Sequence, residues 1–151
     1  MALNIQGYID ATRSHALASG WFDAVNGHEP KSAPHNGITG AVWVDQIDPV
    51  KTSGLASTSV RLTLNVRIYT NMLTEPQDAI DPNVVGATDA LMGAYSADFT
   101  LGGLARHVDL LGIHGVALAG RAGYLNQDNR LFRVMTITLP VIVNDVWDQV
   151  A

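Results

Sequence analysis

The chain has 151 residues, the length of one ordinary domain, so we expect a single domain over 1–151 that buries its own core without metals or disulfides. It has no cysteine, which excludes disulfides, thiolate catalysis and zinc or iron–sulfur sites built on cysteine. The net charge of −5, with no run of Lys or Arg, argues against stable nucleic-acid binding, and the low charged fraction of 15% favours burial of surface in an oligomer.

The N-terminal segment predicts an amphipathic helix over 4–25, because apolar residues recur there every three to four positions with polar residues between them. Gly20 is a point at which the regular helix can end early. A loop follows over 26–37, marked by two glycines and two prolines. No basic segment precedes an apolar core at the N-terminus, and the longest apolar runs are far short of a membrane span, so we expect cytoplasmic synthesis and no membrane partner.

The middle of the chain carries the clearest strand signal. A short apolar run predicts a strand over 38–44, and the polar stretch 45–59 predicts a projecting loop or hairpin tip. In 60–69, apolar residues then alternate strictly with polar ones, which predicts a long central strand with helices on its apolar face. Its polar face holds Arg61 and Arg67, which either contact a neighbouring subunit or nucleic acid, or lie on a solvated face with cross-strand pairing.

The C-terminal half predicts one helix and two strands. Asp81 followed by Pro82 is typical of a helix start, and an apolar stripe continues that helix to about 96–98. After a glycine-rich turn region, strands are expected over 116–124 and 131–143, joined by a turn at 127–129. Pro140 lacks a ladder donor, so it predicts an edge strand, a bulge or a break in the last strand.

The order of these elements predicts an α+β fold. Two helices can cover one face of a mixed, mostly antiparallel sheet of four to five strands, and the last two strands should pair as neighbours.

Side chains that could support catalysis do not form a recognisable pattern. The five histidines show neither HExxH nor HxH spacing, and the local acid pairs lie beside prolines, where turns and helix caps explain them. The glycines lack the lysine of a phosphate-binding loop, and no Gly-x-Ser-x-Gly occurs. We therefore expect no catalytic, cofactor or metal site. An enzyme or ligand-binding domain remains the alternative, with residues gathered from 26–37 and 97–115, among them His35, Asp98 and His107.

Most of the chain resembles the tail terminator proteins of long-tailed, siphovirus-type bacteriophages, especially those of actinobacterial phages. The likeness rests on a series of weak features spread along the sequence. They are the strand end Val66-Arg67-Ile68-Tyr69-Thr70-Asn71, the helix start Asp81-Pro82, the run Ala97-Asp98-Phe99-Thr100-Leu101-Gly102-Gly103, Val108-Asp109-Leu110, Gly123-Tyr124, the turn at Asp128, Phe132-Arg133-Val134 and Ile137-Thr138-Leu139-Pro140-Val141.

The resemblance implies a structural virion protein rather than an enzyme. It implies a hexameric ring in the neck of the virion, assembled in the host cytoplasm, which caps the tail tube and joins it to the head connector. The expected partners are further copies of the chain, the tail tube protein and a head-completion protein, and the genome passes through the channel without specific binding. We expect Arg61, Arg67, Asp98 and Arg106 at subunit interfaces. Another neck or head-completion protein, or a tail tube subunit that forms open stacks, is the alternative within this class.

Overall fold

The fold alternates helices and strands along the chain, as the computed structural model shows for residues 3–22, 24–27, 38–50, 57–71, 80–127 and 129–148. The elements in order are α1 (Ile5–Ala18), β1 (Ala24–Asn26), β2 (Ile38–Val50), β3 (Ser57–Asn71), α2 (Ile80–Ala97), β4 (His107–Val108), β5 (Ala119–Gln127) and β6 (Arg130–Asp148). No described helix is long and apolar enough to cross a membrane.

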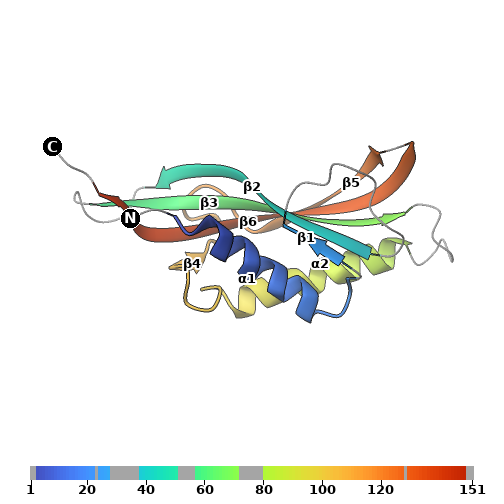
Figure 1. The fold of residues 1–151 in the computed structure, drawn as a ribbon, viewed down its shortest axis with the longest axis horizontal. Helices are drawn as coiled ribbons and strands as arrows, with labels where there is room; N and C mark the ends of the chain where they lie inside the picture. Colours follow the sequence, from blue (N-terminus) through green and yellow to red (C-terminus); the bar gives the residue numbers. More distant parts are fainter. Residues whose placement is uncertain are drawn as a thin grey trace.

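One mixed sheet contains all the described strands, in the order β1-β2-β3-β6-β4, with β5 also paired to β6. Only β1 and β2 are parallel, and every other pair is antiparallel. β6 pairs with β3 on one side. On its other side, β6 pairs with β5 through residues 130–138 and with β4 through residues 141–142, so β5 and β4 share one edge of β6. Figure 1 shows that β2, β3 and β6 form a long twisted ribbon that extends past the helices.

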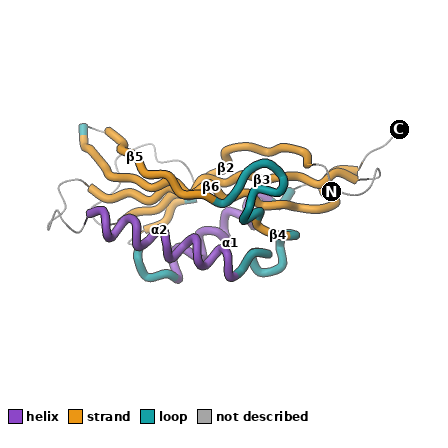
Figure 2. Tube along the Cα trace, turned by 180° about the vertical axis from the view of Figure 1, so that it is seen from behind, coloured by secondary structure: helices purple, strands orange, loops and turns teal. Residues whose placement is uncertain are grey.

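Both helices cover the same face of this sheet (Figures 1 and 2). The main core lies between them and the sheet, and the apolar side chains of β3 pack there with those of α2 and β6, including Leu62, Leu64, Leu91, Tyr95 and Leu139. The predicted α+β class, with a mixed and mostly antiparallel sheet and helices on one face, is confirmed. The sheet has six strands, whereas four to five were expected. The sequence does not reveal β1 and β4, because strands of three and two residues are too short to show a periodic pattern.

Helix α1 is shorter than predicted. It begins after Asn4, whose side chain accepts a hydrogen bond from the Gly7 amide at 3.2 Å, and it ends at Ala18. Gly20 follows with a φ of 79°, a left-handed conformation that terminates helices. Trp21 therefore lies outside the helix, and its ring packs against Gly86 of α2. Helix α2 begins at Ile80, one residue before the predicted cap Asp81.

The polar stretch 45–59, predicted as a projecting loop or a hairpin tip, is strand at both of its described ends. Its described ends are strand, since 46–50 pair with 59–63 of β3 and 57–58 pair with the end of β6, while 51–56 lie outside the described residues. A bulge at Asp45 interrupts the β2–β3 register, and this extra residue explains why the alternation was lost to sequence inspection.

Strand β6 runs through Pro140 without a break, so the predicted edge position, bulge or strand break in β6 is wrong. The carbonyl of Pro140 accepts a hydrogen bond from the Asp109 amide at 2.9 Å, so the proline nitrogen also faces the β4 and β5 side. On that side, the first residue of β5, Ala119, pairs with Thr138, and the last residue of β4, Val108, pairs with Val141. The missing N–H would face the Asp109 carbonyl, which accepts a hydrogen bond from the Leu118 amide at 3.1 Å instead, so the proline leaves no backbone acceptor unpaired there.

Candidate functional site

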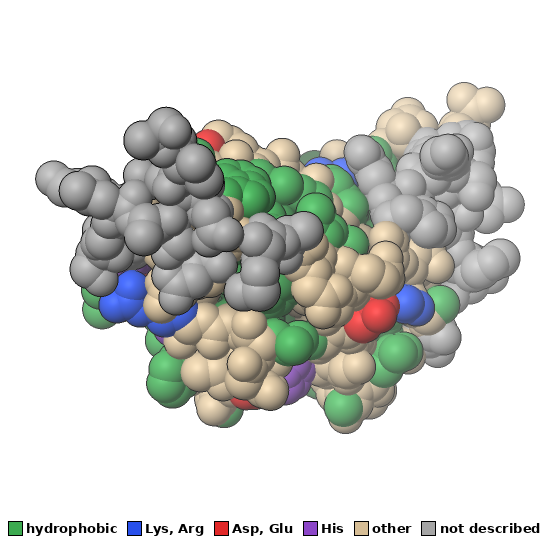
Figure 3. Space-filling view, turned by 60° about the vertical axis from the view of Figure 1, so that its left-hand side comes forward, with side chains coloured by type: hydrophobic (Ala, Val, Ile, Leu, Met, Phe, Trp, Pro, Cys, Tyr) green, Lys and Arg blue, Asp and Glu red, His purple; other side chains and the backbone are tan. Residues whose placement is uncertain are grey.

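The sheet surface opposite the two helices, which we call the helix-free face, is covered by no described helix. Register places on it the alternate residues Arg61, Thr63, Asn65, Arg67 and Tyr69 of β3, with their partners on β2, β6 and β5. Figure 3 shows hydrophobic side chains gathered on the upper side of the molecule, which in Figure 1 is the side away from the helices.

A second apolar cluster lies on this face, separate from the main core. Ala41, Tyr69, Phe132 and Val134 are buried in it, and Trp43 and Leu125 pack against it, partly exposed. Only Trp43 and Leu125 leave apolar surface of this cluster partly in contact with water, and apolar surface on a sheet face without helices is typical of a surface that meets another protein.

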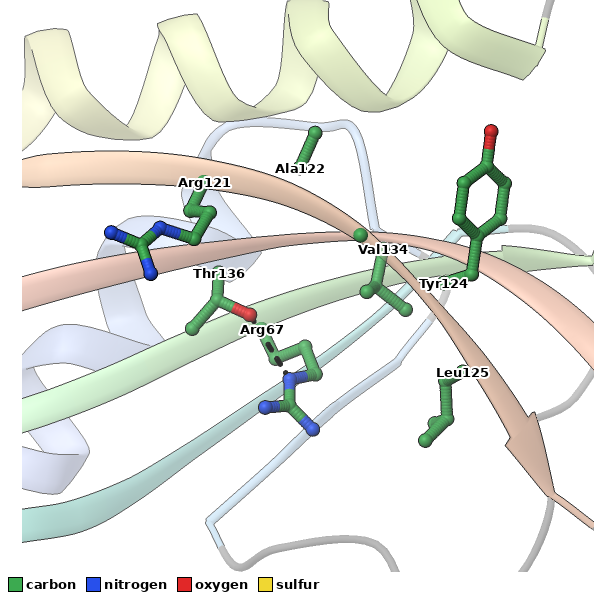
Figure 4. A pocket seen from close by; sticks show the side chains of 8 residues that line it. Arg67, Arg121, Ala122, Tyr124, Leu125, Val134 and Thr136 are labelled. Carbon is green, nitrogen blue, oxygen red and sulfur yellow. Dashed lines mark hydrogen bonds between the residues drawn. The ribbon is translucent and has the colours of Figure 1, made fainter.

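Arg67 stands at the border of this cluster. Its Nε donates to Thr136 Oγ1 at 3.1 Å, and its guanidinium lies 5.0 Å from the centre of the Trp43 ring. Figure 4 shows Arg67 and Arg121 beside a cavity of about 370 Å³, lined by residues of β3, β5 and β6. A neighbouring cavity of about 400 Å³ shares both arginines. Arg121 forms no hydrogen bond or ion pair with another described residue, so its charge is available to a partner.

The tip of the β5–β6 hairpin presents a second aromatic–arginine pair. The Arg133 guanidinium lies 4.6 Å from the centre of the Tyr124 ring and donates to the Gly123 carbonyl at 3.2 Å. The Tyr124 side chain is 63% exposed. Tyr and Arg are enriched in protein interfaces because each offers a large contact area and a polar group together.

Arg61 lies farther along the same face and is held within the chain. Its Nη2 is 2.8 Å from Asp48 Oδ2, and its Nη1 donates to the His114 carbonyl. A hydrogen bond from Gln46 and the Arg61 guanidinium together hold the pKa of Asp48 below its usual range. Arg61 therefore joins β2 and β3 to the segment that connects β4 to β5.

The segment 109–118, which connects β4 to β5, is a loop held by internal hydrogen bonds, and its tip is apolar. The Asp109 carboxylate is buried at 1% exposure and accepts hydrogen bonds from the amides of Ile113 and His114 at 2.9 and 2.8 Å. The side chains of Leu111 and Ile113 are 85% and 78% exposed. The loop thus holds two aliphatic side chains in water at fixed positions, a costly arrangement that favours a contact with another surface.

The two other predicted interface residues lie away from the helix-free face. Asp98 follows α2, where its carboxylate is 2.9 Å from His15 Nε2 of α1 and accepts from the Gly102 amide at 3.0 Å. The Gly102 amide and the His15 ring together lower the pKa of Asp98. Arg106 is exposed just before β4 and lies 3.5 Å from Asn144 Oδ1. The structure therefore places Arg61 and Arg67 on one face, and Asp98 and Arg106 elsewhere.

The residues of the alternative enzymatic hypothesis do not form one constellation. Asp98 pairs with His15, whereas the His107 ring lies 5.8 Å from the His114 ring. Burial and the neighbouring Arg106 lower the pKa of His107. His35 lies outside the described residues. Within the part of the chain that the structure describes, no three His, Asp or Glu side chains are close enough to bind a metal ion.

Sequence inspection did not identify Arg121, Tyr124 or Asp109 as site residues. Arg121 lies in a strand whose glycines and alanines hide its alternation, although counting back from the turn at 128–129 would have paired Arg121 with Thr136. No signal in the sequence indicates that Asp109 is buried.

Comparisons with known proteins give structural similarity only. No family model and no curated protein matches the sequence. Among solved structures, the chain is similar to the sheath/tube terminator of an extracellular contractile injection system, PVC, in its extended state. The TM-score is 0.42 with 14% identity, over 100% of this chain and 62% of that chain. This chain therefore spans under two thirds of that terminator. It is also similar to a chain in the virion of a native gene transfer agent particle, with a TM-score of 0.42 and 9% identity, over 93% of this chain and 98% of that chain.

Proposed function

We propose that this chain is a structural virion protein, a tail terminator whose copies form a ring that caps the tail tube and joins it to the head connector. The observation that carries the proposal is the uncovered half of the sheet. Helices protect one face, while the other leaves Trp43 and Leu125 partly exposed beside a buried apolar cluster and carries the Arg67–Trp43 pair and a loop tip with Leu111 and Ile113. A chain that leaves apolar and aromatic side chains exposed on one face is stabilised when another protein covers them.

The sequence resemblance supports the same role, and the charges are compatible with it. A protein that grips DNA needs free basic side chains along its path. Here Arg61 is paired with Asp48, Arg67 lies over Trp43, and Arg133 lies over Tyr124. With a net charge of −5, such a ring would let the genome pass through its channel without holding it.

Binding at tube ends tests this function directly. Fluorescently labelled chain is mixed with tail tubes assembled from the tube protein, and its position is imaged while tube growth is followed. A terminator binds only at one end of each tube and stops further growth. Labelling along the whole tube would instead identify a tube subunit, and the absence of any binding would overturn the proposal. A Leu111→Ser/Ile113→Ser double variant tests whether the loop tip contributes, and its thermal melting controls for folding.

A further inference from the structure

The sheet has two open edges, and they differ in how well they are protected. Strand β5 pairs with β6 alone among the described strands, and β2 pairs with β1 only over Thr39–Ala41. The edge of β5 has no proline and no bulge, and its one charged residue is Arg121. Edges of this kind bind further strands unless proline, charge or a bulge prevents it. Val42 is fully buried, so the open edge of β2 begins at Val44, and it is limited by Pro49.

The direction of the backbone groups on each edge follows from the backbone hydrogen bonds that β6 accepts. The carbonyls of Pro140 and Ile142 accept from the Asp109 and Arg106 amides, so even-numbered residues of β6 face the β4 and β5 side. In antiparallel pairs, hydrogen-bonded and non-hydrogen-bonded pairs alternate. The N–H and C=O groups of Gly120, Ala122 and Tyr124, which pair with odd-numbered residues of β6, therefore point away from β6 toward the open side.

The same alternation carried across β3 gives the open groups of β2. Odd-numbered residues of β3 face β2, and their partners include Ala41, Trp43 and Gln46. The groups of Val42, Val44 and, after the bulge, Ile47 consequently point outward. The nitrogen of Pro49 also points outward. A proline at such a position of an edge strand costs no hydrogen bond of the sheet.

We infer that β5 of one copy pairs antiparallel with β2 of the neighbouring copy, so that the ring is closed by a sheet shared between subunits. This inference rests on the proposed ring and names its interface. Pairing Val44 with Ala122 and, past the bulge, Ile47 with Gly120 joins outward-pointing groups on both strands, and these residues lie on the helix side of the sheet. The same alignment puts Asp45, exposed at its bulge, opposite Arg121.

Charge and symmetry both favour a second copy of the chain as the occupant. Strand β2 carries Asp45 and Asp48 and no basic residue, whereas β5 carries Arg121 and no acidic residue, so the two edges attract each other. Four strands, β2-β3-β6-β5, lie between the open edges and alternate in direction. The β2 of a neighbour in the same orientation is then antiparallel to β5, as repeated head-to-tail contacts in a ring require.

Charge exchange tests the pairing. The chain is compared with Arg121→Glu, Asp45→Arg and the double variant, and dissociation of the assembly is measured by analytical ultracentrifugation. Each single reversal places like charges together and should weaken assembly by about tenfold, and the double variant should recover most of that loss. Asp89→Arg, an exposed carboxylate on the solvent side of α2, controls for net charge and should leave assembly unchanged.

A backbone test accompanies the charge test. Ala122→Pro removes an N–H that points to the open edge and leaves the β5–β6 ladder intact, so it should abolish assembly while circular dichroism still reports a folded chain. If the unmodified chain assembles and the charge variants assemble equally well, the β5–β2 pairing is wrong and the proposed ring stands. Single reversals that the double variant fails to rescue also overturn the Asp45–Arg121 contact. If the unmodified chain is monomeric at every concentration, the proposed ring itself fails.

Discussion

At the scale of single residues, buried polar groups fix the surface that faces outward. Asp109 is the clearest example, because its carboxylate is buried and bonded to two amides of the loop that carries Leu111 and Ile113. Two amides that would otherwise lose their partners are satisfied by one charged acceptor, and hydrogen bonds to charged groups are the stronger kind. The exposed loop tip therefore depends on a residue that contacts no solvent.

Removing this carboxylate should loosen the loop and destabilise the chain. Asp109→Ala should lower the free energy of unfolding by about 2 to 4 kcal/mol, because two amides lose a charged acceptor. Asp109→Asn, which keeps one carbonyl oxygen, should cost about half as much. Urea denaturation measures both values, and hydrogen exchange of the 110–116 amides should speed up in parallel. Asp89→Ala on the exposed side of α2 is the matched control, expected within about 0.5 kcal/mol of the parent. Equal stability of all three variants would show that Asp109 does not hold the loop.

At the scale of elements, the sequence predicts well where local periodicity is strong. The alternation of 60–69 predicted the position of β3 and its two faces correctly, because a half-buried strand repeats every two residues. The predicted helix over 4–25 was too long, since the apolar spacing continues past Gly20 although the backbone there turns left-handed. The strand residues within 45–59 were not recognised, because the bulge at Asp45 shifts the alternation by one residue.

The site was less predictable than the fold, and the reason is physical. Arg61 and Arg67 were placed on the polar face of β3 from alternation alone, and the structure has them on the helix-free face. What surrounds them depends on pairing between strands far apart in sequence: Asp48 beside Arg61, and Trp43 and Thr136 beside Arg67. No local pattern encodes such register, so neither the apolar cluster nor the open edge of β5 was visible beforehand.

Pro140 offers a test of this sheet register. Pro140→Ala introduces a buried N–H that faces the Asp109 carbonyl, which already accepts from the Leu118 amide, and it also frees the unfolded chain, so we expect a loss of about 1.5 to 3 kcal/mol in unfolding free energy. Pro49→Ala is the control, because its new N–H meets water at the exposed edge of β2 and only the chain-entropy effect of below about 1 kcal/mol remains. Equal losses in denaturant melts would mean that the N–H introduced at residue 140 is not a buried donor without an acceptor of its own.

At the scale of the whole molecule, one sheet serves two purposes. Its helix-covered face holds the main core, and we propose that its helix-free face and its open edges form the contacts between copies. A contact between two different patches of identical subunits closes into a ring when its rotation divides a full turn, and otherwise continues as an open filament. The resemblance to tail terminators implies closure, and a closed ring has no free edge that would recruit further strands.

The mass of the purified assembly tests the central claim most directly. Native mass spectrometry of the 16.1 kDa chain should give one closed species of about 97 kDa, six copies, and negative-stain images of the same sample should show rings with a central hole. A species of 16.1 kDa that persists at all concentrations, or an open series of masses that grows with concentration, would contradict the account.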